Sequence, residues 1–460
     1  MIRIFNHYLH RRTLTGVAFD AGLLMLALLG VVVAQVDSIR MVMPLAGTHV
    51  VSLAAGVFVI STASGLYQSS ERRTTSEYCA RAALALMLSL PLAWVVLGLL
   101  PAGAVNREAI QLSAMLGISA VIVRRVYVSH WERHAAAGSR ILVFGTGRAA
   151  QLVGQTLKAA DPLTRIVGFL QGPNEKEAEV PAGQIVRSER SLYDTARHNG
   201  VDEIVVALAE RRAGSMPLRE LLDCKVRGIR VFDLATHFER TLGQIRIDVV
   251  NAGWLVFGDG FNQGFYRAAI KRAFDIVAAL VLITVAAPVM LLAAIAIKLE
   301  SRGAVFYRQQ RVGANNKVFE VIKFRSMVAD AEKDGRPRWA TTNDSRITRV
   351  GQFIRLARID ELPQVFNVLK GDMSMVGPRP ERPFFVDQLT QEIPYYALRH
   401  SLKPGVTGWA QVRYQYGSTV EDSQEKLQYD LYYVKNHTLF LDIVILLETI
   451  GVVLTGKGAR

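Results

Sequence analysis

Two adjacent carboxylates, Asp360 and Glu361, stand among basic residues in the C-terminal third of the chain. Arginine pairs with phosphate oxygens through two parallel hydrogen bonds, and a carboxylate can attack phosphorus as a nucleophile. Acids can also hold Mg²⁺, which proteins usually bind through one or two carboxylates and the phosphates of a substrate. The pattern predicts a phosphate-transfer site with this acid pair as catalytic residues and Mg²⁺ ligands. Five basic residues are candidates for contacting the phosphates: Arg311, Lys323, Arg325, Arg355 and Arg379.

A single cluster of acids and arginines is usually a set of surface ion pairs. Here three such clusters follow one another between residues 306 and 382, directly after a long apolar run. That concentration favours a site over scattered ion pairs. The elements that must position it are therefore a folded domain and a membrane segment beside it.

Composition supports a membrane protein with more than one domain. The chain has 460 residues, half of them apolar, and a formal net charge of +14. Excess basic residues suit anionic lipid surfaces and phosphorylated substrates. Because they lie beside apolar segments rather than on one polar module, we expect no nucleic-acid partner.

Four apolar blocks fill the first third of the chain, at about residues 16–36, 45–67, 80–100 and 109–123. Each approaches the ~20 residues that cross a hydrocarbon core. We therefore expect residues 1–128 to form a bundle of four transmembrane helices. Basic residues gather at both ends of this region, which predicts that both ends face the cytoplasm. Asp20 is expected to pair with a neighbouring helix or lie at the interface rather than to act inside the membrane.

Residues 139–250 alternate short β-branched runs with helical stretches, a pattern typical of a Rossmann-like α/β module with a doubly wound parallel sheet. Strands are expected near residues 140–144, 166–170, 203–208 and 229–234. The turn Gly145-x-Gly147-x-x-Ala150 could present backbone N–H groups to a phosphate. Gln171 stands where an NAD site wants an acid. An NAD site, another or vestigial nucleotide site, and a purely structural module all stay open.

A linker at residues 251–268 leads to the predicted catalytic domain, residues 269–460, which we expect to be rich in α-helix. It opens with an apolar run at 276–297 that has Pro288 in its middle. An interior proline kinks a helix. A fifth crossing would also carry the acid pair out of the cytoplasm, where nucleotide sugars are found. We therefore expect a re-entrant helix–break–helix at residues 272–298, broken at Pro288. Residues 439–454, apolar but carrying two acids, predict an interfacial helix.

Four motifs carry a resemblance to a known family. They are Lys323-Phe-Arg-Ser-Met327, Asp360-Glu-Leu-Pro-Gln364, Gly371-Asp-Met-Ser-Met-Val-Gly-Pro-Arg-Pro380 and Lys403-Pro-Gly-Val-Thr-Gly-Trp-Ala-Gln-Val412. In this order they resemble the bacterial sugar transferases, the monotopic polyprenyl-phosphate phosphoglycosyl transferases. With its upstream helices and Rossmann-like module, the chain is similar to the large members that begin exopolysaccharide or O-antigen synthesis.

The resemblance implies a multi-pass protein of the bacterial inner membrane, with its catalytic domain on the cytoplasmic face. In such enzymes Asp360 would attack a UDP-sugar and release UMP, and undecaprenyl phosphate would then take the sugar-phosphate from the enzyme. Glu361 would assist with Mg²⁺, and Arg355 and Arg379 would contact phosphate. Analogy to large members also implies a homodimer. The chain departs from the family in having Ala287-Pro288 for Ser-Pro and Arg358-Ile359 for Ser-Leu.

Two other classes of function were weighed against this one. A membrane-anchored, NAD-dependent nucleotide-sugar modifying enzyme of the dehydratase kind needs a tyrosine followed four residues later by a lysine. No tyrosine of this chain has one. A non-catalytic scaffold for polysaccharide export would not need an acid pair ringed by arginines.

Overall fold

A computed structural model represents the protein, and it divides the chain into two compact units. The first comprises residues 1–2 and 8–250, and the second comprises residues 3–7 and 251–460. Each unit is described by itself. The structure describes residues 2–4, 7–9, 11–34, 39–64, 66, 75–98, 107–134, 139–160, 164–173, 175, 178–186, 191–208, 216–250, 252–257, 260–261, 264–328, 346–414, 417 and 419–455. Its first elements are the short strands β1 (Ile2–Ile4) and β2 (His7–Leu9).

Four long helices follow in the first unit: α1 (Arg11–Ala34), α2 (Ile39–Ala63), α3 (Thr75–Gly98) and α4 (Arg107–His134). They share one apolar core that includes Leu28, Leu53 and Ile118. Among the described residues, Cys79–Gly98 and Gln111–Val128 are long and apolar enough to cross a membrane. All four predicted helices are present. Asp20 is 3% exposed and forms ion pairs with Arg124 and Arg125 of α4, as its predicted pairing with a neighbouring helix requires.

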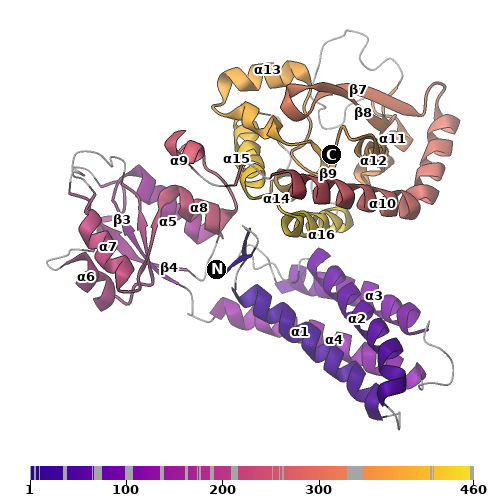
Figure 1. Ribbon diagram of the computed structural model, residues 1–460, viewed down its shortest axis with the longest axis horizontal. Helices are drawn as coiled ribbons and strands as arrows, with labels where there is room; N and C mark the ends of the chain where they lie inside the picture. Colours follow the sequence, from indigo (N-terminus) through magenta and orange to yellow (C-terminus); the bar gives the residue numbers. More distant parts are fainter. Residues whose placement is uncertain are drawn as a thin grey trace. The chain divides into compact units, whose positions relative to one another are not determined.

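The α/β part of this unit has a parallel sheet of four strands in the order β4-β3-β5-β6. The strands are β3 (Arg140–Phe144), β4 (Arg165–Leu170), β5 (Glu203–Val206) and β6 (Arg230–Asp233). Helices α5 (Arg148–Ala160) and α8 (Leu234–Leu242) cover one face, and α6 (Leu192–His198) and α7 (Leu218–Val226) the other (Figure 1). Alternate residues of β3, such as Val143 and Leu142, face the two separate cores. The predicted parallel sheet is confirmed.

The glycine turn of this module is filled by one of the protein's own side chains. The Glu175 carboxylate accepts hydrogen bonds from the backbone N–H of Thr146 at 2.8 Å and of Gly172 at 3.0 Å. It also accepts one from the Thr146 hydroxyl at 3.1 Å. A phosphate bound at this turn would need the same donors. Glu175 therefore occupies the position in which the glycine pattern alone would place a nucleotide phosphate.

The second unit is rich in helix and carries the acid pair. Its helices are α9 (Ala252–Phe257), α10 (Gly264–Glu300), α11 (Arg349–Leu356), α12 (Gln364–Lys370), α13 (Pro383–Glu392), α14 (Trp409–Arg413), α15 (Val420–Asn436) and α16 (Leu439–Thr455). Its strands are β7 (Phe306–Val312) and β8 (Val318–Phe324), an antiparallel hairpin, and β9 (Ser374–Val376) and β10 (Gly405–Thr407), a parallel pair.

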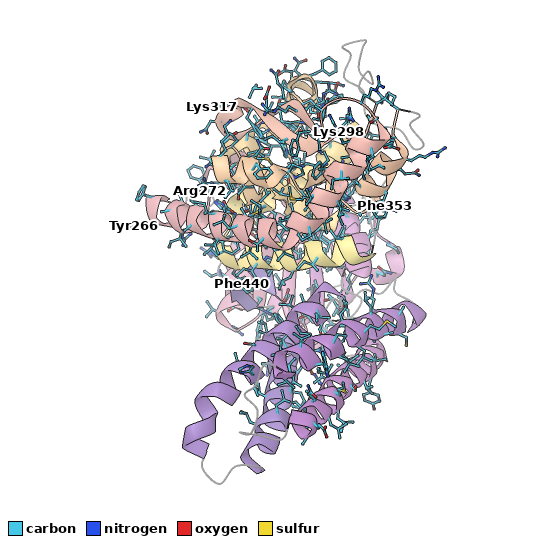
Figure 2. The ribbon with its side chains drawn as sticks, turned by 90° about the vertical axis from the view of Figure 1, so that its right-hand side faces the viewer. Tyr266, Arg272, Lys298, Lys317, Phe353 and Phe440 are labelled. Atoms are coloured by element: carbon cyan, nitrogen blue, oxygen red, sulfur yellow. The ribbon has the colours of Figure 1, made fainter. Side chains whose placement is uncertain are left out.

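Helix α10 is the most apolar candidate span, and it is continuous through Pro288. The structure therefore has no break in the helix at the predicted position. Near one end, Arg272 donates hydrogen bonds to the carbonyls of Val368 and Leu369 at 2.5 and 2.8 Å. Near the other, Ile297 packs in a core of the same domain. A straight helix would hold Arg272 and Ile297 about 38 Å apart, at about 1.5 Å per residue. Figure 2 shows α10 turning between Arg272 and Lys298.

Two of the family-like motifs form the pair β9–β10. Backbone N–H of Ser374 donates to the carbonyl of Pro404 at 2.9 Å, and that of Gly377 donates to Thr407 at 2.9 Å. A Cβ on Gly405 would lie 2.1 Å from the Gly377 nitrogen, so only glycine lets these two backbones approach. Gly377 and Gly405 of these motifs thus allow close packing of the strand that leads to Arg379.

Candidate active site

The acid pair sits on a tight turn after α11. Thr348 caps the start of this helix by accepting a hydrogen bond from Gly351 N–H at 2.9 Å. At its end Arg358 adopts a left-handed backbone, with φ of 59°. A non-glycine residue in this conformation costs on the order of 1 kcal/mol or more, and such strain gathers at functional sites. The turn places Asp360 and Glu361 in a short 3₁₀ segment facing the β7–β8 hairpin.

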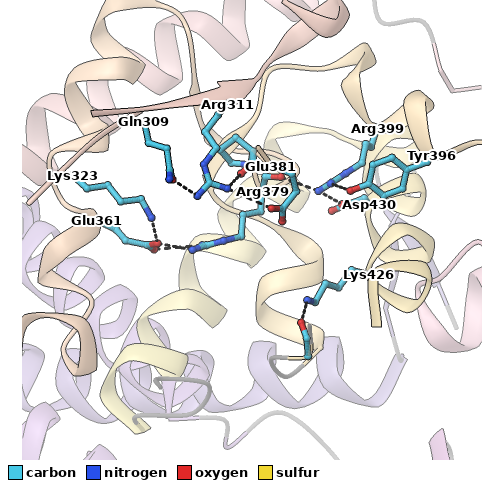
Figure 3. A network of polar contacts seen from close by, with 12 residues as sticks. Gln309, Arg311, Lys323, Glu361, Arg379, Glu381, Tyr396, Arg399, Lys426 and Asp430 are labelled. Carbon is cyan, nitrogen blue, oxygen red and sulfur yellow. Dashed lines mark hydrogen bonds and ion pairs between the residues drawn. The ribbon is translucent and has the colours of Figure 1, made fainter. Parts of the chain in front are cut away.

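Glu361 is held by two cations from different elements. Its Oε1 accepts hydrogen bonds from Lys323 Nζ on β8 at 2.9 Å and from Arg379 Nη2 at 2.6 Å (Figure 3). Burial acts to raise the pKa of this carboxyl, but Arg379 and Lys323 outweigh it and hold the pKa well below its usual range. Glu361 is therefore a permanent anion whose charge is already matched.

Asp360 has the opposite electrostatic balance. Burial, and then the negative charge of Glu361, raises the pKa of Asp360 to about 6. Lys323, Arg355 and Arg379 only partly offset this rise. The pKa values of the two neighbouring carboxyl groups are therefore shifted in opposite directions. Such a pattern marks acids with different chemical roles. Asp360 is ionised near neutral pH but carries a charge that the protein does not fully neutralise, which suits a nucleophile.

A small, open cavity lies beside these residues. Its lining includes Lys323 and Arg379, which bind Glu361, and also Arg311 and Gln364. The Arg311 guanidinium donates to Gln309 Oε1 at 2.6 Å and to the Pro380 carbonyl at 3.1 Å. Three of the five basic residues predicted for phosphate binding therefore line one cavity.

The two remaining basic candidates lie differently. Arg355 is half-buried at the end of α11 and acts on Asp360 through its charge. Arg325 is 9% exposed, and its guanidinium donates to the carbonyls of Arg302 at 2.8 Å and Ser301 at 2.9 Å. Those carbonyls directly follow the last turn of α10. The structure thus gives Arg325 a capping role and not a place in the cavity.

The sequence did not indicate which residues hold the backbone around Arg379 in place. Arg399, which is 5% exposed, donates to the Arg379 carbonyl at 2.9 Å and pairs with buried Asp430 at 2.7 Å. Asn367, 1% exposed, ties α12 to β8 by accepting from Ile322 N–H at 3.0 Å and donating to the Glu320 carbonyl at 2.6 Å. Asn367 lies between two of the motifs quoted above, whereas Arg399 offered no local signal.

Comparisons with known proteins identify the family of the chain. A family model described as bacterial sugar transferase matches residues 266–456, and one described as a CoA-binding domain matches residues 62–217. A UDP-glucose:undecaprenyl-phosphate glucose-1-phosphate transferase of Xanthomonas campestris pv. campestris is 31% identical over 355 residues, covering 74% of this chain and 72% of that protein. This chain belongs to the bacterial sugar transferase family.

Other relatives match over shorter stretches. A protein of Aeromonas hydrophila, named UDP-N-acetylgalactosamine-undecaprenyl-phosphate N-acetylgalactosaminephosphotransferase, is 44% identical over 259 residues, 56% of this chain. An undecaprenyl-phosphate glucose phosphotransferase of Komagataeibacter xylinus is 45% identical over 185 residues, 39% of this chain. The matches span 60% and 35% of the lengths of these two relatives. The relatives of this sugar transferase family differ in the sugar that their names specify.

Proposed function

We propose that this sugar transferase moves a sugar-1-phosphate from a UDP-sugar to undecaprenyl phosphate, giving undecaprenyl-diphosphate-sugar and UMP. This would be the first membrane step of an exopolysaccharide, O-antigen or capsule pathway. The observation that supports it most is that the pKa values of the two adjacent acids are shifted in opposite directions. The acids lie beside a cavity lined by arginine and lysine. The names of the relatives supply the donor and acceptor classes.

In the proposed mechanism an Asp360 oxygen attacks the β-phosphorus of the donor. A bond from carboxylate to phosphorus forms, the bond to the UMP oxygen breaks, and UMP leaves. A phosphate oxygen of undecaprenyl phosphate then attacks the same phosphorus and releases the carboxylate. Lys323, Arg311 and Arg379 line the cavity in which charge builds on the phosphate oxygens, and fixed cations there stabilise the transition state. Arg325 plays no part in these steps.

Mg²⁺ is part of the proposal. Among the described residues no group of three or more His, Cys, Asp or Glu side chains could hold a metal ion alone. A Mg²⁺ ion commonly needs only one or two carboxylates when substrate phosphates complete its shell. Asp360 and Glu361 provide that donor set, and the incomplete neutralisation of Asp360 favours a bound cation. When bound, the ion would neutralise charge on the donor's diphosphate.

The experiment that tests this function uses the purified protein. It is incubated with undecaprenyl phosphate, Mg²⁺ and a panel of UDP-sugars, and released UMP is measured. One sugar is expected to give UMP and a lipid product together. Release of UDP instead of UMP, or no turnover with any donor, would contradict the proposal.

We further propose that the chain is a multi-pass protein of the inner membrane. The helices α1–α4 would form a transmembrane bundle, and α10 would enter and leave on the cytoplasmic face. The support for re-entry is that both ends of α10 contact the same domain. The homodimer that the resemblance implies is a further part of this proposal.

Thiol labelling tests on which side of the membrane the β7–β8 hairpin lies. Lys317 is exposed on the β7–β8 hairpin, so a K317C variant, made after replacing Cys79 by serine, should react with a membrane-impermeant maleimide in inverted vesicles but not in intact spheroplasts. The matched control is R107C, which the same topology places on the outer face and which should show the reverse pattern. Labelling of K317C from the outer face would rule out re-entry.

The raised pKa of Asp360 predicts the pH dependence of the first step. The nucleophile must be ionised, and its pKa is raised to about 6. The rate of UMP release in a single turnover should therefore be constant above about pH 7 and fall roughly tenfold per pH unit below about pH 5. Rapid-quench measurements across this range check the midpoint. A flat profile down to pH 4 would show that Asp360 does not ionise with the raised pKa.

A further inference from the structure

A buried polar network joins strand β9 to helices α10, α15 and α16. Asp275 of α10, Ser374 of β9, Tyr433 of α15 and Asp442 of α16 are each at most 3% exposed. Lys271 connects the two acids, because its Nζ lies 2.8 Å from Asp275 Oδ1 and 3.1 Å from Asp442 Oδ2. None of these residues lines the cavity beside the acid pair.

The network holds strand β9 in place, and β9 leads to Arg379. Asp275 Oδ1 accepts a hydrogen bond from Met375 N–H at 3.1 Å, and it lies 3.0 Å from the Ser374 hydroxyl. The Tyr433 hydroxyl lies 3.0 Å from the Val376 carbonyl. All three residues of β9 are thus fixed to α10 or α15. The arginine that binds Glu361 follows the strand after a short Gly-Pro turn.

Counting hydroxyl hydrogens shows that the network has fewer hydrogens than oxygen–oxygen contacts. The Ser374 oxygen faces both Asp275 Oδ1, at 3.0 Å, and the Val376 carbonyl, at 2.9 Å. The Tyr433 oxygen faces both the Val376 carbonyl, at 3.0 Å, and Asp442 Oδ1, at 2.7 Å. Each hydroxyl has a single hydrogen to donate. Two hydrogens cannot serve four oxygen–oxygen contacts.

An ionised Asp442 would take the Tyr433 hydrogen. The Val376 carbonyl and the Asp275 carboxylate would then compete for the one hydrogen of Ser374, so two of the four buried oxygen–oxygen contacts would lack a hydrogen. A proton on Asp442 Oδ1 removes this competition and leaves only the contact between the Ser374 oxygen and the Val376 carbonyl without a hydrogen. Asp442 then donates to Tyr433, Tyr433 donates to the Val376 carbonyl, and Ser374 donates to Asp275. Oδ2 of Asp442 is left as an acceptor for Lys271.

We propose that Asp442 is a neutral carboxylic acid that donates to Tyr433, and that the chain from Asp442 through Tyr433 to Val376 positions β9 and hence Arg379. Burial raises the pKa of Asp442 despite the nearby Lys271, which agrees with this protonation state. Burial also raises the pKa of Tyr433 well above its ordinary value, so the phenol keeps its hydrogen. Asp275 faces three donors: Lys271 Nζ, Met375 N–H and the Ser374 hydroxyl.

These are positioning residues, so their effect on the reaction passes through Arg379. The kinetic part of the inference rests on the proposed function, while the protonation state does not. A misplacement of about 1 Å at a charged group in an active site can cost about 10²-fold in rate. Losing one contact that fixes β9 should lower the rate by less than this, because Arg399 and Arg311 also hold the backbone at Arg379 and Pro380.

The test compares two replacements of Asp442 in the full-length protein. D442N keeps one donor for Tyr433 and one acceptor for Lys271, so its kcat should stay within about threefold of wild type. D442A removes both, and Y433F removes the hydrogen that reaches Val376. Each should lower kcat about tenfold with a smaller change in KM for the UDP-sugar. If D442N is impaired as strongly as D442A, the neutral acid is wrong. If Y433F keeps full activity, the positioning role is wrong.

Infrared difference spectroscopy tests the proton directly. The wild-type protein at neutral pH should show the carbonyl stretch of a protonated carboxylic acid, and D442N should lack that band. This readout needs no substrate, so it succeeds or fails separately from the transferase activity, and it stays decisive if D442A does not fold. A difference spectrum without the band would overturn the protonation state.

Discussion

Replacing Asp360 by asparagine is expected to lower UMP release by at least about 10⁴-fold, because the amide cannot form the carboxylate–phosphorus bond. The change is nearly isosteric, so the fold and the membrane association should persist. The measurement is UMP formation from the preferred UDP-sugar with undecaprenyl phosphate present. D387N is the matched control, since Asp387 is exposed on α13, and its activity should equal that of wild type.

A second measurement separates a nucleophile from a metal ligand. Wild-type protein given the UDP-sugar alone should gain the mass of one sugar-phosphate, and peptide mapping should locate it on Asp360. The E361Q variant loses the carboxylate that pairs with Lys323 and Arg379, so its turnover rate should fall about 10²-fold. It should still form the adduct. Normal turnover by D360N would remove the nucleophile assignment. An adduct on Glu361 would exchange the two roles.

Much of this arrangement could be predicted from the sequence, because local pattern carries it. The strands of the parallel sheet are short β-branched runs between glycine turns, and the four N-terminal helices are long apolar blocks. The acid pair and Arg379 stand in motifs dense in charge. Such features depend on neighbours within a few residues, and composition reveals them directly.

What the sequence could not reveal depends on contacts between distant segments. Arg325 stands in a motif two residues after Lys323, but β8 ends at Phe324 and the two side chains have different partners: Lys323 binds Glu361 and Arg325 caps α10. Gln171 suggested a missing acid, whereas Glu175 supplies one at the glycine turn itself. Pro288 predicted a break, but α10 is continuous through this residue. In each case tertiary packing decided among conformations that the local sequence allowed.

Replacing Arg379 has the second largest expected effect and links the site's charge to its pH profile. Arg379 donates to Glu361 and lowers the pKa of Asp360 from the value that burial and Glu361 would otherwise impose. R379A should lower kcat/KM by about 10²–10³-fold, the usual cost of removing one fixed donor from a developing oxyanion. R308A is the control, because the Arg308 side chain is 67% exposed on the neighbouring β7 strand.

The pH profile distinguishes this cause from a general loss of structure. Without the cation the Asp360 carboxylate is less favoured, so its pKa must rise and the midpoint of UMP release must move to higher pH. R379K keeps the charge but loses the guanidinium fork, so it should show a reduced rate with the midpoint little changed. A midpoint that stays fixed in R379A while the rate falls would mean that Arg379 acts on the substrate alone. A shift to lower pH would contradict the electrostatic role assigned to it.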